Sequence, residues 1–330
     1  MTRWRSMMGR GCAGLLAIVA AGAACAQPAA NYPNKPVRLL VPNAGASDVI
    51  ARVLGAELNE LWGVPIVVDT RPGASGAIAL DTVAKAAPDG YTLFLGTVNT
   101  NAIAETTFAG VLKMSPSRDL AGVTNLVDIF AALISNPAFA PVTVRRLIDY
   151  AKANSGKLSY ASAGIGTYPQ LDMLRLMKAG GFTATHVPYR TGGGGMVIAL
   201  VGGEVNVGFV NLAASLPHVR NGRMRALAVN TSERHAELPN VPTMTEEGFP
   251  GIGTNAWNGL FVPAGVPAAV VDWIYRSSVE VMNRPQVKER FAKLLMAVVL
   301  SASPREYTEF ARAETRKWAE VIRENNVRIE

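Results

Sequence analysis

The sequence predicts an α/β fold of two lobes, each built on a mostly parallel sheet flanked by helices. Short apolar runs alternate with amphipathic helical segments along most of the chain, which is the pattern of strands joined by covering helices. The length of 330 residues suits two domains. Two extended stretches, near 125–131 and 253–261, are typical of chain that crosses from one lobe to the other.

The first 26 residues predict a secretory signal peptide. Arg3, Arg5 and Arg10 precede an apolar run that ends in the small residues around Ala26, and the stretch contains no acid. We therefore expect an exported, periplasmic protein that is cleaved near Ala26. A lipid anchor at Cys25 is a weaker alternative.

The remaining chain divides into two expected lobes. Residues 27–128 and 253–330 form lobe I, and residues 129–252 form lobe II, which is inserted into lobe I. The strand ends of two open sheets that face each other would share one crevice.

In lobe I, strands are expected at 37–41, 65–69 and 88–96, since each is apolar and bounded by turn residues. The helix that begins near Ser47 or Asp48 has an apolar face broken only by Glu57. A second helix follows at 77–87, and the C-terminal part is predicted as helices over 268–282, 285–295 and 304–325.

Lobe II repeats the same order. A helix at 143–156 opens at Thr143 and closes at Gly156, both favourable capping residues. The remaining segments are expected strands at 157–163, 184–189, 205–210 and 225–229, helices at 170–181 and 196–203, and a polar loop at 230–248.

Composition excludes several classes of protein. Loss of residues 1–26 would lower the formal charge from +7 to +4 without leaving a basic stripe, so we expect no nucleic-acid partner. Both cysteines, Cys12 and Cys25, lie in the removed segment. The three histidines are far apart and form no metal-binding or catalytic pair in sequence, so we expect no metal, no cofactor and neither a zinc enzyme nor a catalytic triad.

Small and polar residues collect in the loops that follow the predicted strands. Such loops at helix N-termini expose backbone N–H groups to an anion, and the helix dipole adds partial positive charge. The chain is therefore suited to hold a carboxylate with amides and hydroxyls. The same residues are also ordinary helix caps, and that structural interpretation stays open.

Other motifs are weaker. The glycines at 192–195 lack the ending of a phosphate loop, and Pro169 replaces the third glycine of a dinucleotide fingerprint. A secreted hydrolase that pairs Ser162 with His186 or His218 is an alternative, and it requires a hydroxyl–imidazole distance near 3 Å, roughly hydrogen-bond length.

Several segments resemble the periplasmic Bug receptors, the TctC-like proteins of tripartite tricarboxylate transporters. They include "YPNKPVRLLVP", "GVPIVVDTRPGASGAIALDTVAKAAPDGYTLFLGT", "GKLSYASAGIGT", "HVPYR" and "LPNVPTMTEEGFPG", and the similarity covers nearly the whole mature chain. The resemblance implies a two-lobed, Venus-flytrap periplasmic-binding-protein fold without enzymatic activity. It also implies capture of a small carboxylate for the membrane components of a transporter.

The resemblance further implies where the ligand binds. The expected contacts are Asn43, Ala44, Gly45, Ala46, Thr97, Asn99, Asn101, Ser162, Gly164, Thr167 and Asn211. Asp48 is most simply a first-turn acid, and we also consider a role in orienting the loop or the ligand.

Three departures from the family pattern affect the ligand. The first loop, "PNAGASD", is about two residues shorter than usual, Val210 replaces a common aspartate, and Gln170 replaces a common histidine. We therefore expect a ligand with an uncharged far end, such as an aromatic or keto acid. The chain is expected to be a monomer, and a sensor of the same ligand for a signalling system remains an alternative.

Overall fold

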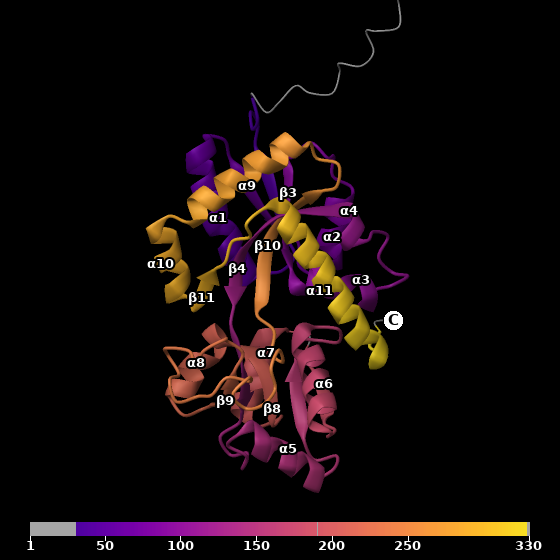
Figure 1. Cartoon of the computed structure of the whole chain (residues 1–330), viewed down its shortest axis with the longest axis vertical. Coiled ribbons are helices and arrows are strands. Elements are labelled where there is room, and N and C mark those ends of the chain that lie inside the picture. The colour runs from indigo at the N-terminus through magenta and orange to yellow at the C-terminus, as the bar shows by residue number, and fades with distance from the viewer. Residues whose placement is uncertain (1–30, 190, 329–330) are drawn as a thin grey trace, which may run out of the picture.

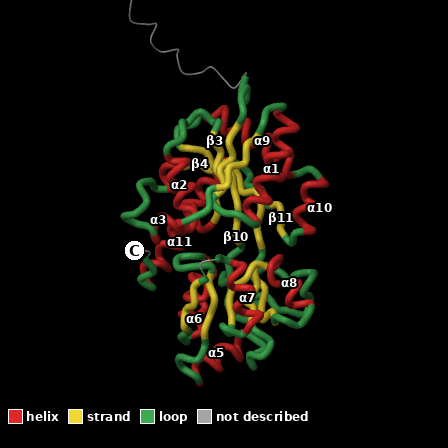
Figure 2. Tube along the Cα trace, turned by 180° about the vertical axis from the view of Figure 1, so that it is seen from behind, coloured by secondary structure: helices red, strands yellow, loops and turns green. Residues whose placement is uncertain are grey.

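The computed structural model describes residues 31–189 and 191–328. The predicted signal peptide and both cysteines lie outside the described residues. The chain forms two lobes, each with its own sheet, stacked along the long axis of the molecule (Figures 1 and 2). The two-lobed α/β prediction is confirmed. Among the helices of the described residues, none combines the length and the hydropathy needed to cross a bilayer.

Lobe I is built on a six-stranded sheet in the order β11-β4-β10-β3-β1-β2. Its strands are β1 (Val37–Val41), β2 (Ile66–Thr70), β3 (Thr92–Thr97), β4 (Leu120–Ile129), β10 (Ala256–Pro263) and β11 (Met296–Val298). Its helices are α1 (Ala46–Trp62), α2 (Ala77–Ala84), α3 (Ala104–Thr107), α4 (Pro116–Asp119), α9 (Ala268–Met282), α10 (Pro285–Lys293) and α11 (Pro304–Glu324), with short turns η1 (Ala74–Gly76) and η2 (Asn99–Ile103).

The predicted apolar face of α1 packs into the core of lobe I. Ile50, Leu54 and Leu58 are fully buried, and a buried leucine or isoleucine of this kind contributes about 1.5–3 kcal/mol to stability. Glu57, the one acid on that face, is neutralised by Arg284, whose Nη1 lies 2.8 Å from its carboxylate. The ion pair explains how an acid is accommodated on the buried side of the helix.

Lobe II is built on a five-stranded sheet in the order β7-β6-β8-β5-β9. Its strands are β5 (Ala131–Ser135), β6 (Ser159–Ser162), β7 (Thr185–Pro188), β8 (Val207–Asn211) and β9 (Arg225–Val229). Its helices are α5 (Val144–Ala153), α6 (Tyr168–Gly180), α7 (Gly193–Gly202) and α8 (Leu212–Arg220).

Both sheets are mixed, which differs from the expectation of mostly parallel sheets. β1 is parallel to β2 and β3, but β10 is antiparallel to both β3 and β4. In lobe II, β5 is antiparallel to β8 and β9. The reversed strands are those next to the crossings. A chain that leaves a sheet along one strand and comes back to it along the neighbouring strand must run in opposite directions in the two strands.

Two local features were not predicted. β11 is a three-residue strand between α10 and α11 that pairs with β4, in a stretch we expected to be helical or loop. Residues Asn99–Ile103 form a turn of π-helix directly after β3, where a loop was expected. Such π-turns are frequent at functional sites.

The chain crosses between the lobes at two adjacent places. β4 ends at Ile129 in lobe I and β5 begins at Ala131 in lobe II, while the return stretch leads from lobe II into β10. The Asp172 carboxylate of α6 accepts hydrogen bonds from the Thr254 N–H at 2.7 Å and the Thr254 hydroxyl at 3.1 Å. This contact fixes α6 to the return crossing.

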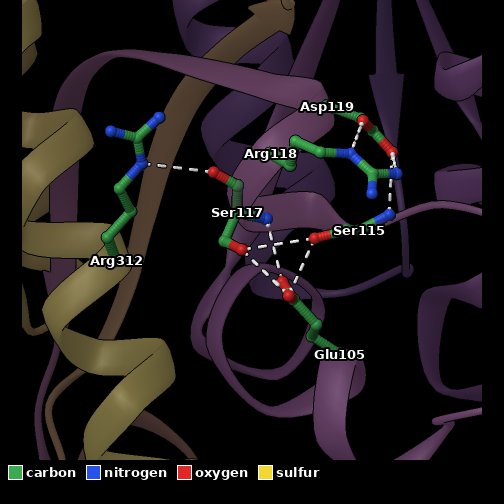
Figure 3. A network of polar contacts seen from close by, with 6 residues as sticks. All are labelled: Glu105, Ser115, Ser117, Arg118, Asp119 and Arg312. Carbon is green, nitrogen blue, oxygen red and sulfur yellow. Dashed lines mark hydrogen bonds and ion pairs between the residues drawn. The ribbon is translucent and has the colours of Figure 1, made fainter.

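A polar network attaches α11 to the rest of lobe I (Figure 3). The Glu105 carboxylate accepts hydrogen bonds from the hydroxyls of Ser115 and Ser117 and from the Ser117 N–H, at 2.8–2.9 Å. Arg312 of α11 donates from Nε to the Ser117 carbonyl oxygen at 3.2 Å. Glu105 therefore caps the start of α4 from α3, and α11 packs onto the same turn.

Candidate functional site

The first loop leaves the N-terminus of α1 open. Gly45 precedes the helix with φ 85° and ψ −132°, and no described atom lies within 4 Å of the position that a Cβ would occupy. The first helical hydrogen bond runs from the Val49 N–H to the Gly45 carbonyl. Within the described residues, the N–H groups of Ala46, Ser47 and Asp48 therefore have no acceptor, as expected of an uncapped helix start.

Two residues of this turn have partners inside lobe I. Ser47 donates from its hydroxyl to Oδ1 of Asn258 at 2.7 Å, which places the start of α1 beside β10, near the end of β10 that leads to lobe II. Asp48 accepts hydrogen bonds from Arg52 at 2.6 Å and from the Thr70 hydroxyl at 2.5 Å. The hydrogen bond from Arg52 and then that from Thr70 hold the pKa of Asp48 below its usual value. Asp48 thus joins α1 to the end of β2. By contrast, Asn43 and Ala44 are exposed.

Three loops of lobe I meet at Gly76. A Cβ at this position would lie 2.4 Å from the side chain of Thr100 and 3.2 Å from that of Pro42. Gly76 has φ 95°, so both its conformation and its surroundings require glycine. The first loop, the turn after β2 and the π-turn after β3 are therefore adjacent, as the sequence predicted for strand ends.

The three predicted residues at the end of β3 and in the π-turn have different surroundings. Thr97 is buried and exchanges hydrogen bonds with Thr100. Asn99 is half-buried, and its Oδ1 lies 3.2 Å from the backbone nitrogen of Tyr168 in lobe II. Asn101 is 2% exposed, and its carbonyl oxygen accepts a hydrogen bond from Thr315 of α11 at 3.1 Å. Asn101 is enclosed within lobe I, and its side-chain oxygen accepts a hydrogen bond at 2.8 Å from the hydroxyl of Thr100, the partner of Thr97.

The start of α6 in lobe II has fewer free donors than α1. Pro169 has no N–H, and the N–H groups of Gln170 and Leu171 donate to the Thr167 carbonyl. The Thr167 hydroxyl donates to the Gly164 carbonyl at 2.7 Å instead of capping the helix. The Tyr168 N–H remains, and Asn99 of the opposite lobe accepts its hydrogen bond.

Tyr168 links this helix start to Asn211. Its hydroxyl donates to Oδ1 of Asn211, which is the last residue of β8 and the N-cap of α8. Burial raises the pKa of the Tyr168 phenol, so the group stays a neutral donor. Asn99, Tyr168 and Asn211 therefore form one chain of contacts from lobe I into lobe II. No sequence pattern indicated Tyr168 beyond its position before a proline that begins a helix.

Ser162 lies within hydrogen-bond distance of an imidazole. Its hydroxyl oxygen is 2.6 Å from Nε2 of His186, and the Gln170 side-chain nitrogen is 3.3 Å from Nδ1 of the same ring. Tyr160 stacks on this ring with centroids 4.9 Å apart, and burial lowers the pKa of His186. The distance required by the hydrolase alternative is therefore present.

The direction of the hydrogen bonds can be assigned along this chain. Gly166 donates its N–H to Oε1 of Gln170 at 2.7 Å, so the Gln170 amide nitrogen faces His186 and donates to Nδ1. The neutral ring then carries its hydrogen on Nε2 and donates it to Ser162, while the Ser162 hydroxyl donates to the Gly164 carbonyl at 3.0 Å. In this state His186 cannot take a proton from Ser162. The network instead holds the loop from Gly164 to Thr167.

The other histidines are elsewhere. His218 lies in the last turn of α8, and His235 contacts Phe130 with ring centroids 5.8 Å apart. In the part of the chain that the structure describes, no group of three or more histidine, cysteine, aspartate or glutamate side chains is suited to hold a metal ion.

Comparison with known sequences gives one family. The sequence profile of the tripartite tricarboxylate transporter family receptor matches residues 50–327. Protein BugT of Bordetella pertussis is 32% identical over 331 aligned residues, covering 100% of this chain and 99% of the relative.

Solved structures agree with the sequence comparison. A Rhodopseudomonas palustris protein determined with adipate has a TM-score of 0.79 at 29% identity, covering 88% of this chain and 97% of that protein. MatC from Rhodopseudomonas palustris with bound malate has a TM-score of 0.76 at 30% identity, covering 88% of this chain and 100% of MatC.

Proposed function

Since the chain belongs to the tripartite tricarboxylate transporter receptor family, we propose that it captures a small organic carboxylate between its two lobes. The family is a class of periplasmic solute-binding receptors. Two structural neighbours were determined with adipate and with malate, both of which are small carboxylates. In our proposal the captured acid is delivered to the membrane components of a tripartite tricarboxylate transporter.

The observation that carries this proposal is the open N-terminus of α1. Three adjacent N–H groups have no acceptor within the described chain, and the small residues of the first loop leave the space in front of them open. A helix N-terminus attracts an anion because the unpaired donors and the helix dipole act together. We propose that one ligand carboxylate binds here, against Gly45 and Ala46.

The far end of the ligand is proposed to contact lobe II. Asn211 and Tyr168 form a neutral polar pair there, and Val210 in place of an acid favours an uncharged or hydroxyl-bearing end over an amino group. The proposed contact residues are Asn43, Ala44, Gly45, Ala46, Thr97, Asn99, Ser162, Gly164, Thr167 and Asn211. Asp48 orients the first loop through Thr70, and Asn101 supports the π-turn from inside lobe I.

Binding is proposed to close two lobes with the limits 27–128 plus 253–330 and 129–252. The ligand favours the closed arrangement to the extent that it gains contacts with both lobes there. The contact between Asn99 and Tyr168 joins the same two surfaces without a ligand. We propose that the lobes meet around the solute next to this contact.

We propose that the protein is not an enzyme, although Ser162 lies close to His186. The partner of Nδ1 is the Gln170 amide rather than a carboxylate, and the Ser162 hydroxyl donates to the Gly164 carbonyl. A hydrolase would need an Nε2 that accepts the proton of this hydroxyl. We also propose that a signal peptide in residues 1–26 directs export of the protein. The exported protein is proposed to be a monomer. Delivery to a sensor for signalling instead of a transporter uses the same binding step.

Calorimetric titration with a panel of organic acids tests this function. Adipate, malate, a keto acid and an aromatic acid are compared with their uncharged amides. At least one acid should bind with one-to-one stoichiometry and raise the melting temperature, while its amide should not. Mass spectrometry of small molecules released by denaturing the purified protein identifies any acid that is already bound. If a folded protein binds none of these acids and releases none, the proposal is wrong.

A further inference from the structure

A cavity of about 370 Å³ adjoins both crossings between the lobes. Its wall comes from β4, from the return stretch before β10, from the residues after β11 and from α11. Among the described residues that line it, none belongs to the proposed carboxylate-binding set. We call it the hinge cavity, and its volume lies in the range of small-molecule pockets, about 300–1,000 Å³.

The hinge cavity has more acidic than basic groups. Asp128, Glu306 and Glu314 line it together with one cation, Lys317. Lys317 pairs with Glu314, which also accepts the indole N–H of Trp257 at 3.3 Å. Within the described chain, Asp128 and Glu306 form no ion pair. Burial and then the nearby charge of Glu314 raise the pKa of Asp128, so this carboxyl would gain from a cation beside it.

Unpaired amide oxygens surround the same carboxyl. Asn125 is 7% exposed and donates from its side-chain nitrogen to Oδ1 of Asp128 at 2.8 Å. Oδ1 of Asn125 accepts no hydrogen bond from the described residues, and neither does Oδ1 of Asn255 on the other side of the cavity. Buried acceptors of this kind are normally paired. The described residues therefore supply no donor to these two buried oxygens, although the Asn125 amide nitrogen donates to Asp128.

Aromatic rings form the path from the inner end to the rim. Trp257 is buried, Phe310 is 40% exposed on α11, and their ring centroids are 5.7 Å apart in an edge-to-face arrangement. Such rings accept both methylene groups and organic cations. Because the described residues form no metal-binding group, an organic donor matches this wall better than a metal ion.

We propose that the hinge cavity binds a small aliphatic amine. One ammonium group would lie against Asp128, beside the side-chain amides of Asn125 and Asn255. The methylene chain would pack on Trp257 and Phe310. In a diamine the second ammonium group reaches the rim near Glu306. This site is separate from the carboxylate site and does not depend on it.

Calorimetric titration with 1,4-diaminobutane tests the proposal. 1,4-Butanediol is the uncharged comparison, and Asp272→Asn, which removes an exposed acid on α9, is the matched control for Asp128→Asn. We expect one-to-one diamine binding to the wild type and to Asp272→Asn, binding at least about tenfold weaker to Asp128→Asn, and no binding of the diol. Loss of a hydrogen bond to a charged group accounts for an effect of that size.

Phe310→Ala and Glu306→Gln provide independent tests at exposed positions, where misfolding is not expected. Each variant should weaken diamine binding at least threefold. If Asp128→Asn fails to fold, these two variants test whether the diamine binds in the hinge cavity. The proposal is overturned if the diamine does not bind, if the diol binds equally well, or if the folded cavity variants bind the diamine as tightly as Asp272→Asn does.

Discussion

Oδ1 of Asn99 in lobe I accepts a hydrogen bond from the backbone N–H of Tyr168 in lobe II. The donor is the first N–H of α6, which Thr167 leaves uncapped because its own hydroxyl donates to Gly164. The helix start of one lobe is thus capped by a side chain of the other. Because its two groups belong to different lobes, this contact depends on the relative position of the lobes.

Replacing Asn99 by alanine should weaken the contact between the lobes. The variant loses the acceptor for the α6 N–H, which as a helix cap contributes about 1 kcal/mol. We expect ligand affinity to fall about fivefold and the unliganded protein to become more extended in small-angle X-ray scattering. Asn283→Ala, at an exposed position after α9, should change neither property. Unchanged affinity and dimensions in Asn99→Ala would contradict this role.

Gly45→Ala should impair binding more than stability alone explains. Gly45 has φ 85° and ψ −132°, a conformation nearly confined to glycine, so an L residue there costs about 1–3 kcal/mol, and a methyl group would stand before the open N–H groups of α1. Gly222→Ala is the control, because Gly222 also has a positive φ, 72°, and open surroundings in a turn after α8. Urea unfolding should show a loss of stability for both variants, whereas calorimetry should show weaker acid binding for Gly45→Ala only.

Stability should decrease as the pH falls through the titration of His186. Burial lowers the pKa of His186 in the folded protein, so the unfolded chain binds this proton more readily and is favoured below about pH 6.5. Protonation would also place a hydrogen on Nδ1, facing the Gln170 amide nitrogen. The urea midpoint of the wild type should fall more between pH 7.5 and pH 5 than that of His186→Gln. Parallel curves for the two proteins would exclude His186 as the source.

Glu105→Ala should destabilise lobe I by about 2 kcal/mol, since a part-buried carboxylate with hydrogen bonds from two serines is removed. Glu309→Ala on α11 is the control, because its exposed pair with Arg305 contributes at most about 1 kcal/mol. Chemical denaturation measures both. A loss in Glu105→Ala no larger than in Glu309→Ala would show that the network of Figure 3 adds little.

The sequence predicted those parts of the fold that local patterns determine. The apolar face of α1 and the buried run of β1 follow from residue spacing alone, and both are present. β11 was missed because three apolar residues beside a helix carry no strand signal of their own. The antiparallel direction of β10 was missed because strand direction depends on where the chain returns to the sheet.

For the candidate site, too, the sequence predicted local features but not contacts between distant segments. Small residues before α1 indicated an open helix start, and the structure has one at Gly45. Asn101 lies within the π-turn, and its side chain is buried in lobe I. No sequence pattern revealed that turn, so the orientation of Asn101 was not predictable. The contacts of Asn99 and His186 join segments distant in sequence, so they required the fold.

The attachment of Asp172 to Thr254 limits how the lobes can separate. Because this bond ties α6 to the return crossing, we expect α6 to move with the crossing when the lobes separate. The bond between Asn99 and Tyr168 and the ion pair between Lys178 of α6 and Glu324 of α11 would then have to break, while the bond at Thr254 could stay intact. We expect that a membrane partner which breaks the contact between Asn99 and Tyr168 would release the solute without unfolding either lobe.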